Sequence, residues 1–335
     1  MPVPLLATVR GQPTAVETLR RALRTGRVHH AYLFDGRDGV GKERAAFGLA
    51  QALVCERREA GGADACGACS ACGRAVPRAG ERRPSHPDVV VIERGLYDPA
   101  SIGRRTPETQ EISIDQVRAL VLARAAFPPY EGRAKVFLIR RAEQLSTSAA
   151  NALLKTLEEP GARTHFVLLS SSAESLLATT RSRTQRIRFG ALPERLVVEL
   201  LVERGIAPAD AARIAPLSAG SIGAALALCD PEQTQRRDEF LSRATAALAA
   251  RDVGPALELA EEAKRGDKES LVACLEALSS ALASEARETA AAPDRRADVA
   301  VARHALAMQA IRNIEEFNAA TQLAVEAMLL KMRRV

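Results

Sequence analysis

Apolar and polar positions follow two patterns along the first 190 residues. Short apolar runs, typical of strands that are buried on both faces of a parallel sheet, occupy residues 31–35, 88–93, 135–139, 165–170 and 184–189. Between these runs, apolar residues recur at helical spacing over 12–24, 42–54, 114–126 and 146–158. Strands that alternate with helices predict a doubly wound α/β domain, with helices flanking a parallel sheet.

The strand pattern stops near Leu192, and the remaining sequence is helical in pattern. Residues 192–228 form short apolar segments that Gly and Pro interrupt, and the sequence from about 233 onward is Ala-rich with long helical periodicity. We therefore predict three domains with these boundaries: an α/β domain at 1–190, a small helical domain at 191–230 and an all-α domain at 231–335.

Composition adds limited detail to this picture. The chain is 47% hydrophobic but only 3% aromatic, without Trp, so its cores are expected to be aliphatic. The net charge of +6, from 47 basic and 41 acidic residues, permits an anionic partner without requiring one. Neither a signal peptide nor an apolar run near the roughly 20 residues of a membrane span is evident, which predicts a cytoplasmic protein without membrane contact.

The first strand candidate leads into residues 36–43 (GRDGVGKE), which have the spacing of a phosphate-binding loop. Backbone N–H groups can turn toward a phosphate at the three glycines of this loop, Gly36, Gly39 and Gly41. Lys42 can reach the terminal phosphates, but Glu43 replaces the Ser or Thr that normally binds Mg²⁺. The pattern predicts a P-loop fold and leaves ATP or ADP binding open, with a Gly-rich turn that holds no ligand as the alternative.

The strand at 135–139 is where a P-loop ATPase carries the acidic residues that hold Mg²⁺ and polarise the attacking water. Here the strand runs into Arg140 and Arg141, and the next carboxylate, Glu143, lies too far along to replace them. Mg²⁺ ligands are therefore missing at both Glu43 and Arg140. We predict that hydrolysis by this chain's own site is absent or very slow.

Four of the six cysteines lie close together, at Cys55, Cys66, Cys69 and Cys72, in and just before a Gly- and Arg-rich insertion at 56–84. CxxC spacing lets neighbouring thiolates face one ion, which predicts a structural Cys₄ zinc site that orders the segment. An iron–sulfur cluster is less favoured, because the fourth ligand lies upstream and no Cys-Pro follows. Four unrelated reduced cysteines are the remaining alternative. A second insertion without periodicity lies at 95–110.

Four arginines fall within eight residues around Ser182-Arg183-Thr184, at Arg181, Arg183, Arg186 and Arg188. On the pattern alone, a solvated surface is the favoured interpretation. The functional alternative is an arginine on the rim of an α/β domain that reaches across a subunit interface and stabilises charge on a neighbour's γ-phosphate.

Several of these features occur in the order and spacing of one protein family. They are residues 30–34 before the P-loop, the cysteine insertion after its helix, the string 151–160 (NALLKTLEEP) and the Ser-Arg-x sequence at 182–184. With them the chain resembles the bacterial replicative clamp-loader subunits of the AAA+ class, over about residues 9–230. The string at 151–160 is the most specific element of the resemblance.

The resemblance implies a AAA+ α/β domain, a helical lid and a C-terminal helical collar in a five-subunit ring that loads the sliding clamp onto primed DNA. It implies a non-hydrolysing subunit, because Glu43, Arg140 and the Gly-rich residues 220–223 depart from the motor pattern. Arg183 would then act in trans, on ATP held by the adjacent motor subunit; Thr184 replaces the Cys that usually follows. The implied partners are gamma/tau and delta subunits and, through the assembly, the sliding clamp and primer–template DNA.

Two other functions stay open on the sequence alone. A motor subunit of the same ring would hydrolyse ATP with Mg²⁺ as an isolated chain. A zinc-containing nucleic-acid-binding module that keeps a P-loop fold as a relic would bind DNA by itself, with strong dependence on salt. The modest net charge and the scarcity of aromatic residues disfavour this second alternative.

Overall fold

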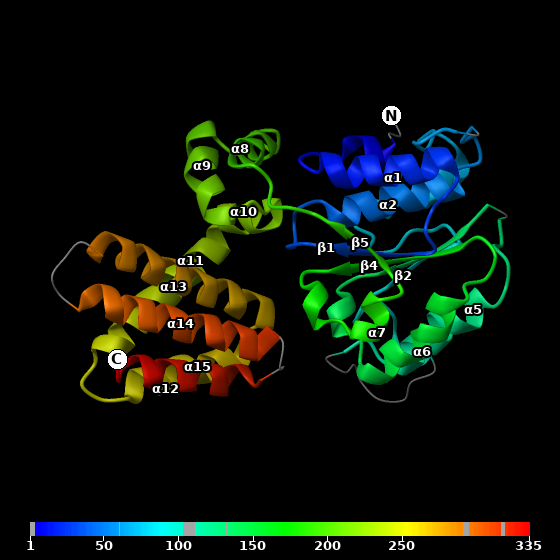
Figure 1. Cartoon of the computed structure of the whole chain (residues 1–335). Coiled ribbons are helices and arrows are strands. Elements are labelled where there is room, and N and C mark those ends of the chain that lie inside the picture. Colours follow the sequence, from blue (N-terminus) through cyan, green and yellow to red (C-terminus); the bar gives the residue numbers. More distant parts are fainter. Residues whose placement is uncertain (1–3, 60, 103–110, 132, 291–294, 316–318) are drawn as a thin grey trace. The chain divides into compact units, whose positions relative to one another are not determined.

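The computed structural model describes residues 4–59, 61–102, 111–131, 133–290, 295–315 and 319–335. The chain forms two compact units, Met1–Leu226 and Ala227–Val335 (Figure 1). The predicted division into three domains, with boundaries at 190 and 230, stays a prediction. Most of the predicted insertion at 95–110 lies outside the described residues, and its described part contains a 3₁₀ turn at Pro99–Ile102.

The first unit is built on a parallel sheet whose five described strands are β1 (Ala31–Asp35), β2 (Val89–Ile92), β3 (Lys135–Ile139), β4 (Thr164–Ser170) and β5 (Gln185–Arg188). Their spatial order is β2-β3-β4-β1-β5, and every neighbouring pair is parallel. All residues of the interior strand β3 are buried, which accounts for the apolar run at 136–139. The strands predicted from the apolar runs are confirmed.

Helices cover both faces of this sheet. The helices α1 (Pro13–Thr25) and α2 (Lys42–Val54) lie on one face, and α6 (Thr147–Glu158) lies on the other (Figure 1). Alternate residues of β1 enter the two cores: Tyr32 and Phe34 pack with α1 and α2, whereas Leu33 packs with α6. The predicted α/β class, a parallel sheet with flanking helices, is confirmed.

The helix predicted over 114–126 is present with an irregular centre. It begins at α4 (Ile114–Val117) with the capping box of Ser113 and Gln116, continues as a π-helical turn over Arg118–Leu122 and ends in α5 (Ala123–Ala125). The remaining helices of the first unit are η1 (Leu5–Thr8), α3 (Ser70–Arg74), η4 (Ala142–Gln144), η5 (Ala173–Ser175), α7 (Ala178–Arg181), α8 (Glu194–Val202), α9 (Pro208–Ile214) and η6 (Ala215–Ser218).

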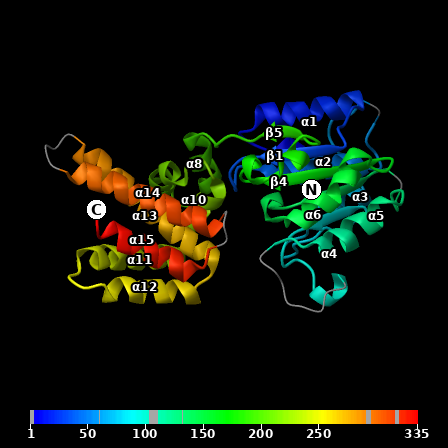
Figure 2. The same ribbon diagram turned by 60° about the horizontal axis from the view of Figure 1, so that its bottom comes forward.

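From α10 (Ile222–Cys229) onward, the described residues form helices without strands. They are α11 (Pro231–Ala249), α12 (Gly254–Arg265), α13 (Lys268–Thr289), α14 (Arg296–Glu315) and α15 (Thr321–Met332). The helices α13 and α14 pack along each other, and α15 lies beside α12 (Figure 2). Their core is mostly Ala, Leu, Ile and Met, with Phe240 as its one aromatic side chain among the described residues. None of the helices in the described ranges has the length and hydropathy that a membrane span requires.

Candidate functional site

The P-loop connects the end of β1 with the start of α2, as predicted. Gly36 and Gly39 have φ angles of 152° and 75°, in the region that favours glycine. A Cβ atom on Gly36 would lie 2.2 Å from the carbonyl oxygen of Phe189, so this position requires a glycine. The Lys42 side chain is only 6% exposed, and its Nζ donates to the carbonyl of Gly36 and, at 3.1 Å, to Asp38 Oδ1. The P-loop itself therefore supplies hydrogen-bond acceptors for the Lys42 ammonium.

The start of α10 lies directly against the P-loop. The Ile222 amide donates to Gly39 O at 3.2 Å, and Ser221 Oγ donates to Asp38 O at 2.7 Å. A Cβ atom on Gly39 would lie 2.5 Å from the backbone nitrogen of Gly223, so the two segments approach at backbone distance. The residues 220–223, which depart from the motor pattern, are thus in contact with the phosphate-binding loop.

The two positions at which Mg²⁺ ligands are missing, Arg140 and Glu43, contact each other. Arg140 follows β3, its side chain is 14% exposed, and its guanidinium donates to Glu43 and, at 2.8 Å, to Glu93 Oε2. Glu43 opens α2 and Glu93 follows β2, so three separate elements supply this cluster. Arg82 also pairs with Glu93, at 3.1 Å, so two arginines and two carboxylates balance one another at the site where a P-loop ATPase would bind its metal.

The four predicted metal ligands converge. Cys55 ends α2, Cys69 and Cys72 flank the first turn of α3, and the four Sγ atoms all lie within 4.8 Å of one another. Cys66 Sγ and Cys72 Sγ are 3.9 Å apart, close to the edge of about 3.8 Å that a tetrahedron with Zn–S bonds of about 2.3 Å would have. This donor set could hold a metal ion such as Zn²⁺.

Backbone amides support the thiolate form at this cluster. The amides of Cys66 and Cys69 donate to Cys55 Sγ and Cys66 Sγ, each at 3.3 Å. Desolvation by itself would raise the pKa of Cys66, but hydrogen bonds from the backbone of Ala68 and Cys69 and from neighbouring thiols lower it to about 6. Burial raises the pKa of Cys72, and hydrogen bonds with the Cys69 and Cys55 thiols raise it further. A bound dication would favour the thiolate form of its ligands.

Arg183 lies at the end of β5 that is opposite the P-loop. It follows α7 and precedes β5, in a hollow of about 390 Å³ that is also lined by His29, His30 and Leu157. Its Nε donates to Glu158 Oε1 at 2.6 Å, and its Nη1 donates to Thr179 O at 2.8 Å. The side chain is 30% exposed, so the guanidinium is oriented by the protein and still accessible to an anion.

The sequence analysis proposed Arg183 as a candidate but not Glu158, the residue that orients it. Glu158 lies in the string at 151–160 that carries the family resemblance, and this was the available signal. Thr184, which replaces the usual Cys, donates from Oγ1 to Arg181 O at 3.0 Å and closes the turn before β5. The other arginines of the cluster differ in role: Arg186 pairs with Asp35 at 2.6 Å, on the P-loop strand β1.

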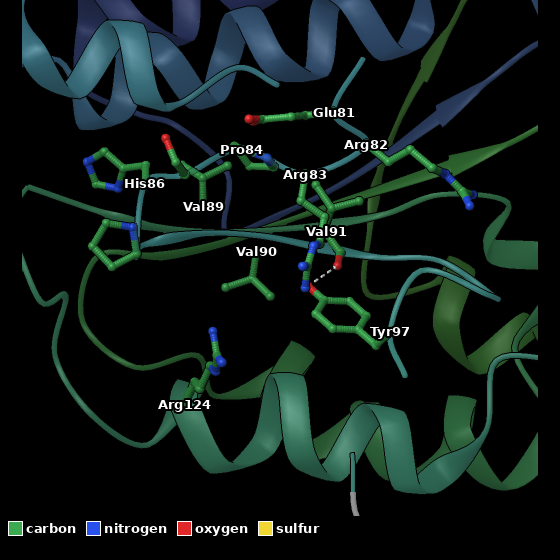
Figure 3. Close-up of a pocket in the computed structure, with 12 residues that line it drawn as sticks. Glu81, Arg82, Arg83, Pro84, His86, Val89, Val90, Val91, Tyr97 and Arg124 are labelled. Atoms are coloured by element: carbon green, nitrogen blue, oxygen red, sulfur yellow. Dashed lines mark hydrogen bonds between the residues drawn. The ribbon is translucent and has the colours of Figure 1, made fainter. Parts of the chain in front are cut away.

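A larger hollow, of about 650 Å³, follows the edge strand β2 (Figure 3). Tyr97 donates from its hydroxyl to Val91 O at 2.9 Å, and the guanidinium of Arg83 lies 4.7 Å from the Tyr97 ring centre. Figure 3 shows Arg124 reaching toward this space from α5. The described residues that line it include none of the predicted site residues, so we leave this hollow out of the candidate site.

Comparison of the sequence with known proteins identifies relatives of this chain. Residues 11–193 match the family model described as DNA polymerase III, delta subunit. The delta' subunit of DNA polymerase III from Bacillus subtilis is 31% identical over 229 residues, which are 68% of this chain and 60% of that protein. Its counterpart from Escherichia coli is 35% identical over 223 residues, 66% of this chain and 61% of that protein.

Similarity also extends to a second type of subunit. The gamma/tau subunit of DNA polymerase III from Mycobacterium tuberculosis is 36% identical over 195 residues, 58% of this chain and 30% of that protein. The chain thus spans less than two thirds of the length of each of these relatives. A solved gamma-subunit-related protein from Thermotoga maritima covers 95% of this chain and 98% of its own, with 17% identity and a TM-score of 0.46. Because the family model matches more than half of the chain, and the Bacillus relative aligns with 68% of it, the chain belongs to the clamp-loader AAA+ family of DNA polymerase III subunits.

Proposed function

We propose that the chain is the delta-prime subunit of a DNA polymerase III clamp loader, a non-hydrolysing AAA+ partner that supplies Arg183 to ATP on an adjacent subunit. The observation that carries this proposal is the guanidinium of Arg140 between Glu43 and Glu93. The Arg140 guanidinium occupies the space between these carboxylates, and Arg82 also pairs with Glu93, so neither carboxylate is left to hold a Mg²⁺ ion. A γ-phosphate would in addition be repelled by the Glu43 carboxylate.

The contacts of Lys42 point the same way. To reach a phosphate, its ammonium would have to leave the Gly36 carbonyl and Asp38, which satisfy it within the loop. The close approach of Gly39 to Gly223 also narrows the space above the loop. Static binding of ATP or ADP would therefore require rearrangement of both segments, and hydrolysis would additionally require a metal ligand that neither Glu43 nor Arg140 can replace.

The position of Arg183 supports action on a neighbour. The P-loop follows the carboxyl end of β1, whereas Arg183 precedes the amino end of β5, and these adjacent strands run parallel. The five residues of β1 extend over roughly 16 Å at about 3.3 Å per residue, so Arg183 cannot reach a phosphate on its own P-loop. An arginine finger on this edge would have to serve another chain's nucleotide.

The remaining parts of the proposal follow from this role. The partners would be gamma/tau and delta subunits and, through the assembly, the sliding clamp and primer–template DNA, in the cytoplasm. The helices from α8 to α10 would form the lid, and those from α11 to α15 the collar that joins the ring. The four cysteines would hold a structural Zn²⁺ that takes no part in nucleotide chemistry.

The test compares ATP turnover by the chain alone with turnover in a loader reconstituted with gamma/tau and delta subunits. We expect no measurable turnover by the chain alone with Mg²⁺, and a loss on the order of tenfold to a thousandfold at the affected site for Arg183→Ala. Arg188→Ala, in the same arginine cluster, is the matched control and should leave the rate unchanged. Brisk turnover by the isolated chain would favour a motor subunit instead.

A further inference from the structure

Two aromatic side chains project into solvent from a short loop after α5. Phe127 is 67% exposed and Tyr130 is 86% exposed, although aromatic residues make up only 3% of the chain. Phe34, Phe137 and Phe166 of the same unit are fully buried, and Tyr97 is partly buried. Neither the fold nor the chemistry proposed above uses the two exposed rings.

Two buried charges hold the backbone of this loop in place. Lys135 is 6% exposed, and its Nζ donates to the carbonyls of Arg124, Phe127 and Pro128 at 2.7, 3.0 and 3.2 Å. Asp88 is 1% exposed, and its two carboxylate oxygens accept from the amides of Tyr130 and Glu131, each at 2.7 Å. Pro128 and Pro129 restrict the backbone further. The rings are therefore presented by a rigid loop, which would lose little conformational entropy on binding.

The loop lies on the same edge of the sheet as Arg183. Lys135 is the first residue of β3, Asp88 immediately precedes β2, and Arg183 precedes β5 by two residues. Because all described strands are parallel, their amino ends share one edge. β3 and β5 are three strands apart in the sheet order, which corresponds to roughly 14 Å.

Direct packing connects the two features along this edge. Glu158, which orients Arg183, is followed by a loop in which a Cβ atom on Gly161 would lie 2.8 Å from Ala125 O. Ala125 is the last residue of α5, two positions before Phe127. The Lys135 amide in turn donates to Arg163 O at 2.9 Å. A short series of contacts along this edge therefore connects the aromatic loop with the arginine.

We propose that Phe127 and Tyr130 anchor the adjacent AAA+ subunit, the one whose ATP Arg183 serves; this inference rests on the proposed function. Exposed aromatic side chains on a backbone held by hydrogen bonds are the kind of residue that carries most of the binding energy at the centre of protein interfaces. The two rings call for an apolar partner surface, which on this proposal lies on the neighbour near its nucleotide site. Docking of the two rings there would bring Arg183, about three strands away, into line with the neighbour's γ-phosphate.

The first test measures the affinity of the full-length chain for a full-length gamma/tau subunit in a direct binding titration. We expect the double variant Phe127→Ser, Tyr130→Ser to bind roughly thirtyfold more weakly or worse. Leu217→Ser is the matched control, because Leu217 is also an exposed apolar residue, 63% exposed, and is far along the chain from this loop. The affinity of the Leu217→Ser variant for gamma/tau should not change. An affinity of the double variant within about threefold of the unaltered chain would overturn the proposal.

A second measurement identifies the occupant. Tyr130 is replaced with a photoreactive benzoylphenylalanine, and the reconstituted loader is irradiated with its clamp and primer–template DNA present. A crosslink to gamma/tau supports the proposal, whereas a crosslink only to DNA, to the clamp or to delta contradicts it. The outcome is separable from that of the arginine test, since Arg183→Ala should lower ATP turnover in assemblies that still form and still crosslink.

Discussion

The two edges of the parallel sheet use charged residues in opposite ways. At the carboxyl edge, Lys42 donates within its own loop and Arg140 is held by Glu43 and Glu93, so the charges are satisfied inside the chain. At the amino edge, Arg183 is oriented by one carboxylate and remains 30% exposed. The P-loop edge is closed by internal contacts, whereas the opposite edge presents groups outward.

Under the proposed function, this difference lets a nucleotide-binding fold keep its architecture without its chemistry. The glycines of the P-loop still permit the tight turn, and the sheet keeps the order that places a loop between β1 and α2. What differs is the charge balance: a guanidinium stands where a metal ion would be needed. Under the proposed function, the chain acts through its amino edge, where Arg183 lies, and not through its own P-loop.

Loss of the proposed metal site should have the largest effect on stability, and it should act on the amino edge. The cysteine cluster lies at the end of α2, and Arg74 of the adjoining α3 donates to Glu131 at 2.6 and 2.7 Å, next to the aromatic loop. We expect Cys69→Ser to lower metal content and to cost on the order of 3 kcal/mol of unfolding free energy. Hydrogen exchange should increase at residues 55–75 and 127–131 but not in the P-loop.

The metal prediction has a matched control in Cys274→Ser. Cys274 is buried in the helical core of the second unit, outside the cysteine cluster, so its loss should leave metal content unchanged. Equal metal content in Cys69→Ser and the unaltered chain, measured by atomic absorption after gel filtration, would rule out the four-cysteine site.

Arg140→Ala, at the carboxyl edge, should have an intermediate effect on the free energy of unfolding. Its removal leaves Glu43 and Glu93 without their shared cation in a partly buried position, which should cost about 1–3 kcal/mol in denaturant unfolding. Arg183→Ala breaks a more exposed pair and should cost less than about 1 kcal/mol. If the two variants lose equal stability, the carboxyl edge is not held together by its internal charges as described.

Much of the fold could be predicted from the sequence, because its signals are local. Apolar runs such as 135–139 match buried strands, and the Ser113–Gln116 pair marks the start of a helix. The π-helical turn over Arg118–Leu122 could not be predicted, because one extra residue per turn barely alters the apolar spacing.

The candidate site was predictable only in part, for a related reason. The sequence indicated that Mg²⁺ ligands were missing, but the contact of Arg140 with Glu43 spans 97 positions and depends on how β3 and α2 pack. The pairing of Arg183 with Glu158 spans 25 positions and is likewise set by the tertiary fold. Phe127 and Tyr130 escaped notice because an aromatic residue in a sequence is normally assigned to a core.

Acidification should have the smallest effect on the free energy of unfolding, and it should again act at the amino edge. Burial lowers the pKa of His30, His86 and His165, which lie near the amino ends of β1, β2 and β4. For His86, burial outweighs the attraction of the Glu131 carboxylate, 3.3 Å from Nε2, which acts to raise the pKa. The unfolded chain therefore binds protons more readily, and stability present above pH of about 6.5 is lost as the pH falls below it. His86→Gln should reduce this loss, as measured by denaturant unfolding between pH 7.5 and 5.5, and an unchanged pH dependence would remove His86 as a contributor.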